Sequence, residues 1–535
     1  MQSRTQFDYI VVGAGSAGCV LANRLTQSGR YSVLLLEAGG EDNNPWIHIP
    51  LGYGKHFSNP KVNWLYQSEA EDNTGNRRIA QPRGKVLGGT SSINGLVYVR
   101  GQREDYDEWR DLGNPGWGYA DVLPYFRKAE NNQRGANEYH GADGPLSVSD
   151  TSDPHPLCEA FFDAAESCGY PRNDDFNGAT QAGFGYVQVT QRKGRRSSAA
   201  VAYLRPARRR PNLTIETRAH ATRILFSDRR ATGVEYLQGG VTRSANARNE
   251  VLVAGGAFNS PQLLQLSGVG PAALLEGLGI GVIADMPGVG ANLSDHYNGR
   301  LVFECTEPIT LNDVVGNLGR SVREGLRYLF LRKGFLTMGA SYAAGFLATE
   351  PGVERPDTQV GLVLFSADKF GDGLHPFPGF TLLVRLLRPE SRGTVHITSA
   401  DPLEPPAIRP NYLGTPKDRQ TLVAGMKAAR SIVDAPALRR YVARAHEPAQ
   451  RFHSDEEWLA YVRTRGGISY HPNGTCVMGR GEDAVVDERL RVRGLEGLRV
   501  VDASIMPTLV SGNTNAPTIM IGEKGADMIL EDAPR

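Results

Sequence analysis

The sequence has 535 residues, 40% hydrophobic and 22% charged, which is typical of globular proteins and excludes disordered, collagen-like and coiled-coil chains. At roughly 150 residues per domain, this length predicts two large domains or three to four smaller ones. Lys plus Arg (59) nearly balances Asp plus Glu (58), so the basic excess of a nucleic-acid-binding protein is missing and no nucleic-acid partner is expected. We interpret the two basic clusters, Arg192–Arg196 and Arg208–Arg210, as solvated loop surfaces.

The cysteines and the first residues of the sequence indicate the cellular compartment in which the protein is expected. The five cysteines are scattered and form no CxxC pair, which argues against a disulfide framework and a zinc site; we expect no metal. A reducing compartment such as the cytoplasm is therefore favoured. The first apolar run begins within ten residues of the start, so no signal peptide is expected. No stretch approaches the ~18 apolar residues that span a bilayer, so membrane association, if any, is expected to be peripheral.

The chain opens with a strand–turn–helix–strand pattern. Phe7–Val12 predicts a strand, Cys19–Leu25 a helix and Tyr31–Leu36 a second strand, with the turn Gly13-Ala14-Gly15-Ser16-Ala17-Gly18 between the first two. Glu37 and Ala38 close the second strand. Such a βαβ unit implies parallel strands joined by a right-handed crossover.

The glycines of this turn predict a dinucleotide site. Gly13 makes the tight turn, Gly15 lets the backbone approach a pyrophosphate, and Gly18 lets the helix pack closely on the sheet. Glu37 follows Gly18 by 19 residues, close to the spacing of an acid that binds a ribose diol. The acid favours FAD or NAD over NADP. The alternative is a glycine-rich turn in an α/β protein that binds no dinucleotide.

Later segments predict a second, different domain between two parts of the first. Strands are expected at 211–226, 234–237 and 250–254, and a helix that begins with Ser260 as N-cap and Pro261 in its first turn. Between 311 and 461 the pattern changes to an antiparallel sheet and two helices, with strands at 345–348, 359–365 and 381–387 and helices at 418–433 and 455–465. A last strand (494–502) and helix (516–529) complete the first domain.

Five motifs, in order along the chain, resemble those of the GMC (glucose–methanol–choline) oxidoreductases. They lie at 82–95 (PRGKVLGGTSSING), 256–270 (GAFNSPQLLQLSGVG), 471–479 (HPNGTCVMG), 501–504 (VDAS) and 512–518 (GNTNAPT). Within the family, the sequence is most similar to the bacterial choline-dehydrogenase-like branch, which includes long-chain-alcohol and polyethylene-glycol dehydrogenases.

The resemblance implies an α/β FAD-binding Rossmann-like domain plus an α+β substrate domain with a six-stranded antiparallel sheet. We expect three FAD-binding parts, at 1–155, 191–304 and 466–535, the last with the catalytic residues. The substrate domain is expected at 305–465, with an excursion into it at 156–190.

The resemblance also implies FAD-dependent oxidation of an alcohol to the aldehyde, with hydride transfer to flavin N5. His471 would take the hydroxyl proton, since an unperturbed pKa near 6.5 leaves it largely neutral. Asn515 would donate to the alkoxide, or would simply cap the last helix. The electron acceptor is left open among oxygen, a quinone and a cytochrome.

Further residues are assigned by the same motifs. Ile93 stands where some relatives carry a flavin-linking histidine, so FAD is expected to be non-covalent. Tyr342 stands where choline-using relatives have a glutamate, so a neutral primary alcohol (aliphatic, aromatic or polyether) is expected rather than choline. The residues assigned to the cofactor are Gly13, Gly15, Ser16, Ala17, Gly18, Glu37, Ala38, Gly88, Gly89, Ser92, Asn94, Gly95, Val97, Ala221, Asp502, Ala503, Pro517 and Thr518.

Three alternative functions remain open at this point. A choline dehydrogenase would share every motif quoted above. A hydroxynitrile-type lyase has the same fold with FAD as a structural group, and a non-catalytic flavin-binding protein would have lost the catalytic pair. Bleaching of the yellow protein by alcohols would separate redox chemistry from the last two.

Overall fold

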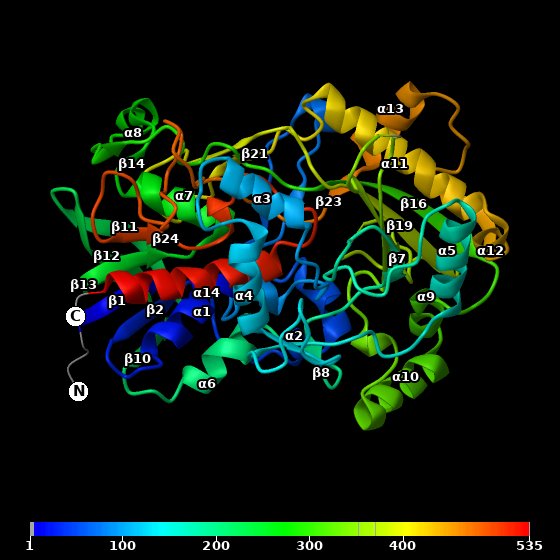
Figure 1. The fold of residues 1–535 in the computed structure, drawn as a ribbon, viewed down its shortest axis with the longest axis horizontal. Coiled ribbons are helices and arrows are strands. Elements are labelled where there is room, and N and C mark those ends of the chain that lie inside the picture. Colours follow the sequence, from blue (N-terminus) through cyan, green and yellow to red (C-terminus); the bar gives the residue numbers. More distant parts are fainter. Residues whose placement is uncertain (1–4, 351, 370, 534–535) are drawn as a thin grey trace.

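The computed structural model describes residues 5–350, 352–369 and 371–533. It consists of two lobes that lie side by side, each with its own sheet and hydrophobic core (Figure 1). Both ends of the described chain lie in the same lobe, on the left in Figure 1, and the middle of the chain builds most of the other. We call these the first and the second lobe.

The first lobe contains a mixed sheet. Its strand order is β10 (Leu213–Thr217), β2 (Val33–Glu37), β1 (Gln6–Val12), β13 (Val241–Val253), β12 (Arg230–Gln238) and β11 (Ala219–Ser227), with β24 (Leu498–Val500) also paired to β13. β1 and β2 are parallel in the register Val12↔Leu36, so the predicted βαβ unit is confirmed. α1 (Ser16–Thr26) packs against α14 (Asn515–Asp532), which joins the two ends of the chain.

The second lobe contains an antiparallel sheet. Its strand order is β22 (Val442–Glu447), β16 (Tyr297–Cys305), β19 (Gly379–Leu386), β18 (Thr358–Val363), β17 (Ala343–Leu347) and β7 (Gly183–Tyr186). The two-residue β23 (Gly467–Ile468) adds a seventh strand to the six expected. α5 (Pro156–Ser167), α11 (Pro416–Asp434), α12 (Pro436–Arg439) and α13 (Asp455–Arg465) contribute to the core of this lobe.

Further α-helices and small strand pairs complete the described part of the chain. The helices are α2 (Pro45–His48), α3 (Arg103–Asp111), α4 (Tyr119–Ala129), α6 (Arg205–Ala207), α7 (Gly256–Leu266), α8 (Ala272–Gly277), α9 (Leu311–Val315) and α10 (Leu318–Leu331). The strands form small pairs: β3 (Tyr66–Gln67) with β4 (Ala80–Gln81), β5 (Glu130–Asn132) with β6 (Leu146–Val148), β8 (Gln191–Arg192) with β9 (Arg195–Arg196), β14 (Val269–Gly270) with β15 (Ala284–Asp285), and β20 (Thr394–His396) with β21 (Ala407–Arg409).

The start of α7 differs from the sequence prediction. The helix begins at Gly256, and Pro261 lies inside it rather than in its first turn after a Ser260 cap. A carboxylate from the far end of the chain explains the earlier start: Asp502 Oδ2 accepts from the Gly256 amide (2.8 Å) and from the Ser260 hydroxyl (2.6 Å). An acidic oxygen at a helix N-terminus satisfies its free N–H group and the helix dipole.

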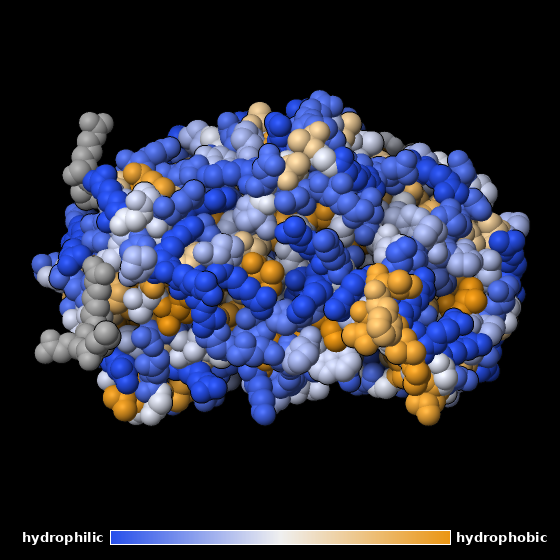
Figure 2. Space-filling model, turned by 90° about the horizontal axis from the view of Figure 1, so that it is seen from below, coloured by the Kyte–Doolittle hydropathy of each residue, from blue (hydrophilic) through white to orange (hydrophobic). Residues whose placement is uncertain are grey.

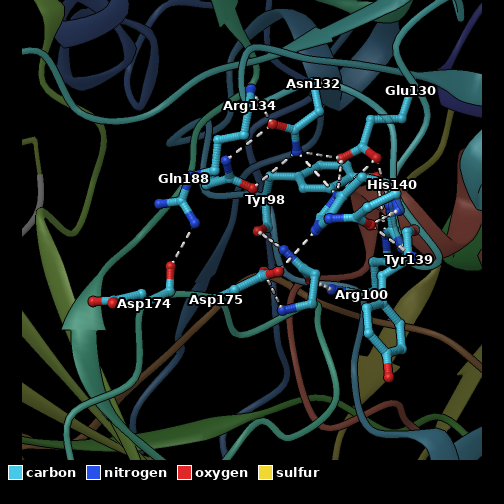
Figure 3. Close-up of polar contacts among 12 residues, drawn as sticks. Tyr98, Arg100, Glu130, Asn132, Arg134, Tyr139, His140, Asp174, Asp175 and Gln188 are labelled. Atoms are coloured by element: carbon cyan, nitrogen blue, oxygen red, sulfur yellow. Dashed lines mark hydrogen bonds and ion pairs between the residues drawn. The ribbon is translucent and has the colours of Figure 1, made fainter.

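A buried polar cluster connects three segments beside the first lobe's core (Figure 3). Arg100 pairs with Glu130 at 2.7 Å, and His140 lies between Glu130 and Asp175, 2.9 Å from each. Burial alone would lower the pKa of His140, but its two carboxylate partners outweigh burial and raise it. Burial likewise opposes the lowered pKa of Glu130, which Arg100 and His140 produce. The cluster is therefore charged, and each buried charge has a partner.

Candidate active site

A large cavity lies between the two lobes and is lined by both. The first lobe contributes the turn after β1 and the segments around residues 254–259 and 502–503. The second lobe contributes side chains from β18, β19 and the segment before 471, among them Gln359, Leu383 and Arg385. A cavity at the carboxyl ends of parallel strands is the usual ligand position in an open α/β sheet.

The glycine turn has the geometry that its sequence predicts. Gly13 has a φ of +99°, and a Cβ placed there would lie 2.5 Å from the carbonyl oxygen of Ala254. A Cβ on Gly18 would lie 1.9 Å from the carbonyl oxygen of Gly13. Only glycine fits either position, and the start of α1 can therefore sit directly beneath the cavity.

Glu37 lies at the cavity wall with its carboxylate held by backbone. Its Oε2 accepts from the Ala14 amide (3.0 Å) and its Oε1 from the Gly39 amide (2.8 Å). Burial raises the pKa of this carboxyl to about 7, although the two amides oppose the shift. Each oxygen keeps a further lone pair, so the group can also accept from the hydroxyls of a ribose.

Most residues assigned to the cofactor from the sequence line the cavity. Those that do are Gly13, Gly15, Ser16, Ala17, Glu37, Ala38, Gly89, Asn94, Gly95, Val97, Ala221, Asp502, Ala503 and Thr518. Gly18, Gly88, Ser92 and Pro517 are not part of the lining. Ser92 is buried and donates to the Leu87 carbonyl at 2.7 Å, and a Cβ on Gly88 would lie 2.3 Å from the Ser92 hydroxyl. Ser92 and Gly88 therefore lie behind the wall and do not form it.

His471 lies in this cavity, and its surroundings determine its tautomer. His296 Nε2 lies 2.9 Å from the Leu387 carbonyl, which only accepts, so that nitrogen carries the proton. Burial lowers the pKa of His296 to about 3, so its Nδ1 is bare and accepts from His471 Nδ1 at 2.9 Å. Burial, with Arg385 and His296, also lowers the pKa of His471 well below its usual value. The neutral His471 ring therefore carries its lone pair on Nε2.

Asp295 holds the backbone of the two histidines and contacts Tyr412. Its Oδ1 accepts from the backbone amides of His471 (2.7 Å) and His296 (2.8 Å), and its Oδ2 from the Tyr412 hydroxyl (3.0 Å). Burial raises the pKa of Asp295 to about 6. Asp295 and His296 were not identified from the sequence, because the adjacent pair carries no spacing signal and meets His471 only through folding.

The predicted amide partner of His471 requires a correction. Asn513, not Asn515, contacts the histidine: its Nδ2 lies 3.0 Å from His471 Nε2. Asn515 lines the cavity, but its Oδ1 accepts from the Ser16 hydroxyl at 2.8 Å. Asn515 is also not the cap of α14, because the N-cap residue is Thr514. Asn515 is the first residue of α14 and faces the start of α1, whereas Asn513 lies before the helix and reaches the histidine.

The interpretation of Arg192–Arg196 as a solvated surface is wrong for one member. Arg196 is buried, and its Nη1 donates to Asn94 Oδ1 (2.6 Å) and to the Ser91 carbonyl (3.1 Å). Burial lowers the pKa of this guanidinium to about 9. Asn94 and the neighbouring Ile93 both line the cavity, so a positive charge supports this wall.

Tyr342 does not reach the cavity lining. It is buried in the second lobe, where its hydroxyl donates to the Asp153 carbonyl at 2.6 Å. Its neighbour Ser341 lines the cavity instead, because successive residues of an extended segment point in opposite directions.

The second-lobe end of the cavity carries a positive charge. Arg385 donates to the Ser469 hydroxyl and to Gln359 Oε1, and no carboxylate of a described residue lies within ion-pair distance of it. Burial lowers the pKa of Arg385 to about 10. The acidic residues in the described lining are Glu37 and Asp502, which both belong to the first lobe. Arg385 therefore places a positive charge at this end of the cavity.

One cluster outside this cavity has metal-ligand chemistry. Asp368, His375 and His446 each offer one ligand atom, and these atoms lie within 4.8 Å of one another. His375 Nε2 already pairs with the exposed Asp368 at 3.3 Å, so these two side chains have a partner without a metal ion between them.

The cavity fits FAD on its own features. It runs from the bare backbone of Gly15 to His471, and Glu37 is positioned for a ribose. Several buried polar atoms of lining residues, among them Asn513 Oδ1 and the Tyr53 hydroxyl, have no partner within the described chain. Such orphaned atoms are expected where a polar ligand completes the site.

Comparisons with known proteins identify the family. The chain matches the GMC oxidoreductase family over residues 7–298 (N-terminal part) and 389–522 (C-terminal part). It is 45% identical to "Alcohol dehydrogenase [acceptor]" from Pseudomonas putida, covering 98% of this chain and 96% of the other. It is 44% identical to the mitochondrial choline dehydrogenase of Homo sapiens, covering 99% and 90% respectively.

Solved structures give the same result for the fold. The crystal structure of pyridoxine 4-oxidase from Mesorbium loti superposes with a TM-score of 0.90 at 30% identity, covering 98% of this chain and 100% of the other. Formate oxidase superposes with a TM-score of 0.92 at 27% identity. The protein thus has the GMC fold and is an FAD-dependent oxidoreductase that acts on the CH–OH group of alcohols.

Proposed function

This chain belongs to the GMC oxidoreductase family, and we propose that it oxidises a neutral primary alcohol to the aldehyde with His471 as the base. The observation that carries the proposal is the direction of the histidine tautomer. A neutral imidazole whose Nδ1 proton is donated to His296 has its lone pair on Nε2, the nitrogen beside Asn513 in the cavity. This is the arrangement that a general base requires.

Three residues of this chain contribute to the transfer of the hydroxyl proton. His471 Nε2 accepts the hydroxyl proton of the alcohol, and its Nδ1–H stays bonded to His296 throughout. Asn513 Nδ2 donates to the oxygen as negative charge develops on it. Asp295 holds the backbone of both histidines in place through their amides. FAD, when bound, supplies the acceptor for the two electrons that leave the alcohol carbon.

The charge at the second-lobe end supports a neutral substrate over choline. A quaternary ammonium is stabilised by carboxylates or an aromatic cage and is repelled by Arg385. A neutral chain can bury its CH₂ groups there at about 0.8 kcal/mol each. From the sequence, we expected choline to be a poor substrate because of Tyr342, which does not line the cavity. The same expectation now depends on Arg385, which does.

The test is anaerobic addition of alcohols to the purified yellow protein. We expect octanol, benzyl alcohol or a short ethylene glycol to bleach it, and choline to do so with a lower kcat/KM. Bleaching by none of these alcohols would favour the lyase or the non-catalytic alternative. The variant Arg385→Gln should raise the choline kcat/KM relative to octanol; no change in this ratio would remove Arg385 from substrate selection.

The electron acceptor is testable in the same preparation. We expect the bleached protein to be reoxidised by one of three classes: oxygen, a quinone or a cytochrome. Comparing the three reoxidation rates assigns the enzyme as an oxidase or a dehydrogenase.

A further inference from the structure

The helix α10 is amphipathic, but its polar face packs against the protein and its apolar face points to solvent, the reverse of the usual arrangement. Its polar residues Glu324 and Tyr328 face the protein, where Glu324 Oε2 accepts from the Phe335 amide (3.2 Å) and Tyr328 donates to the Gly194 carbonyl (3.0 Å). Its apolar residues face outward, with Leu318 82% and Phe330 76% exposed. The outward apolar set is Leu318, Val322, Leu326, Leu329, Phe330 and Leu331 of α10, together with Val315 at the end of α9.

These seven residues make up more than half of the large, exposed hydrophobic side chains among the described residues. They form one contiguous patch, which is visible at the position of α10 in Figure 2. Single exposed apolar residues are normal, but a patch of this kind marks an interaction surface. Among the described helices, none is long and apolar enough to cross a membrane.

Basic residues surround the apolar patch. Residues 318–333 contain Arg320, Arg323, Arg327, Arg332 and Lys333 but one acid, Glu324. The chain as a whole has a net charge of +1, so this segment holds a local excess of positive charge. Arg327 pairs with Asp153 at 3.2 Å, and no ion pair is found for the other four within the described chain. Their charges are therefore available to a partner.

We propose that α10 lies on the surface of an anionic lipid bilayer, with its apolar face among the acyl chains and its basic residues at the headgroups. An apolar stripe of Leu, Val and Phe with flanking Arg and Lys is the pattern of interfacial helices. A second copy of this chain is the less favourable partner, since two such surfaces would bring like charges together.

The segment that follows α10 connects this surface to the cavity. The chain leaves α10 through the short turn Phe335–Thr337 and then lines the cavity with Ala340 and Ser341. The same turn packs against Pro50–His56, whose Tyr53 and His56 also line the cavity. Docking through α10 therefore brings one wall of the cavity close to the membrane.

The test is flotation of the FAD-loaded full-length enzyme with vesicles of phosphatidylglycerol and phosphatidylcholine, and with phosphatidylcholine vesicles alone. We expect binding to the anionic vesicles at least ten-fold tighter, since each basic residue near such a surface contributes about a five-fold factor. The apolar variant is Leu326→Gln/Leu329→Gln/Phe330→Gln, which should weaken binding at least ten-fold. The matched control is Val241→Gln/Leu403→Gln, which removes exposed apolar groups elsewhere and should bind as wild type.

Further arms separate charge from self-association. Arg323→Glu/Lys333→Glu should abolish the preference for anionic vesicles, and all variants should retain FAD and alcohol-dependent reduction of a soluble dye. Equal vesicle binding by wild type and the apolar variant, or no binding by wild type, would overturn the proposal. So would a wild-type dimer in light scattering that the apolar variant converts to a monomer, which would identify a second copy as the partner.

Discussion

The contact between His296 and His471 predicts that a residue distant from the substrate controls turnover. In His296→Phe, the Nδ1–H of His471 loses its acceptor, which lies 2.9 Å away and is fully buried. A buried donor without a partner costs about 1–3 kcal/mol. At 1.36 kcal/mol per factor of ten, kcat should fall about 5- to 150-fold, because the ring can then turn or change tautomer.

The assay is single-turnover reduction of the bound flavin by a saturating alcohol, measured across pH. His296→Asn is the matched control, since its Oδ1 can still accept from His471 and should restore at least part of the rate. FAD content and the melting temperature show whether each variant is folded. A kcat within two-fold of wild type in a folded, FAD-loaded His296→Phe would refute the tautomer argument, as would an Asn variant no faster than the Phe variant.

Three further predictions follow from the site and the polar cluster. His471→Ala should lower kcat by a factor of about 10² with FAD content unchanged, and Asn513→Ala should lower kcat more than Asn515→Ala; the reverse order would restore the sequence-based assignment. FAD affinity should rise with pH through about 7 as Glu37 ionises in the FAD-free protein, and Glu37→Gln should abolish this dependence in a fluorescence titration. The pKa of His140 is raised in the folded protein. The stabilisation that protonated His140 gives the fold is therefore complete below its unfolded pKa of about 6.5 and is lost as the pH rises through the folded pKa. His140→Gln should lower the melting temperature most at acidic pH, and an equal loss at every pH would contradict this.

Local signals in the sequence were sufficient for the regular elements and for the cofactor turn. The helix expected at 455–465 is α13 to the residue, because Ser454 caps it and Glu457 completes the capping box. The glycine turn and Glu37 were identified because their chemistry requires fixed spacings within one βαβ unit. His471 was identified by its motif and lies in the cavity.

The errors share a physical cause, which is contact between segments distant in sequence. The start of α7 depends on Asp502, and the burial of Arg196 on the carbonyl of Ser91. The choice between Asn513 and Asn515 depends on where α14 begins relative to α1. α10 was missed although its apolar residues Leu318, Val322, Leu326 and Leu329 recur at helical spacing; the sequence does not show that this face points outward.

The pairing of the two chain ends in the first lobe has a consequence for biosynthesis. β24 is added to β13 near residue 500, and α14 packs on α1, where Arg24 pairs with the buried Glu523 at 2.7 Å. A chain still held by the ribosome therefore has the glycine turn long before it has Asp502, Asn513 or the last helix. The cofactor cavity is complete only once these later segments have folded against the first lobe. A variant truncated before Asp502 is therefore expected to lack a complete cofactor cavity and redox activity.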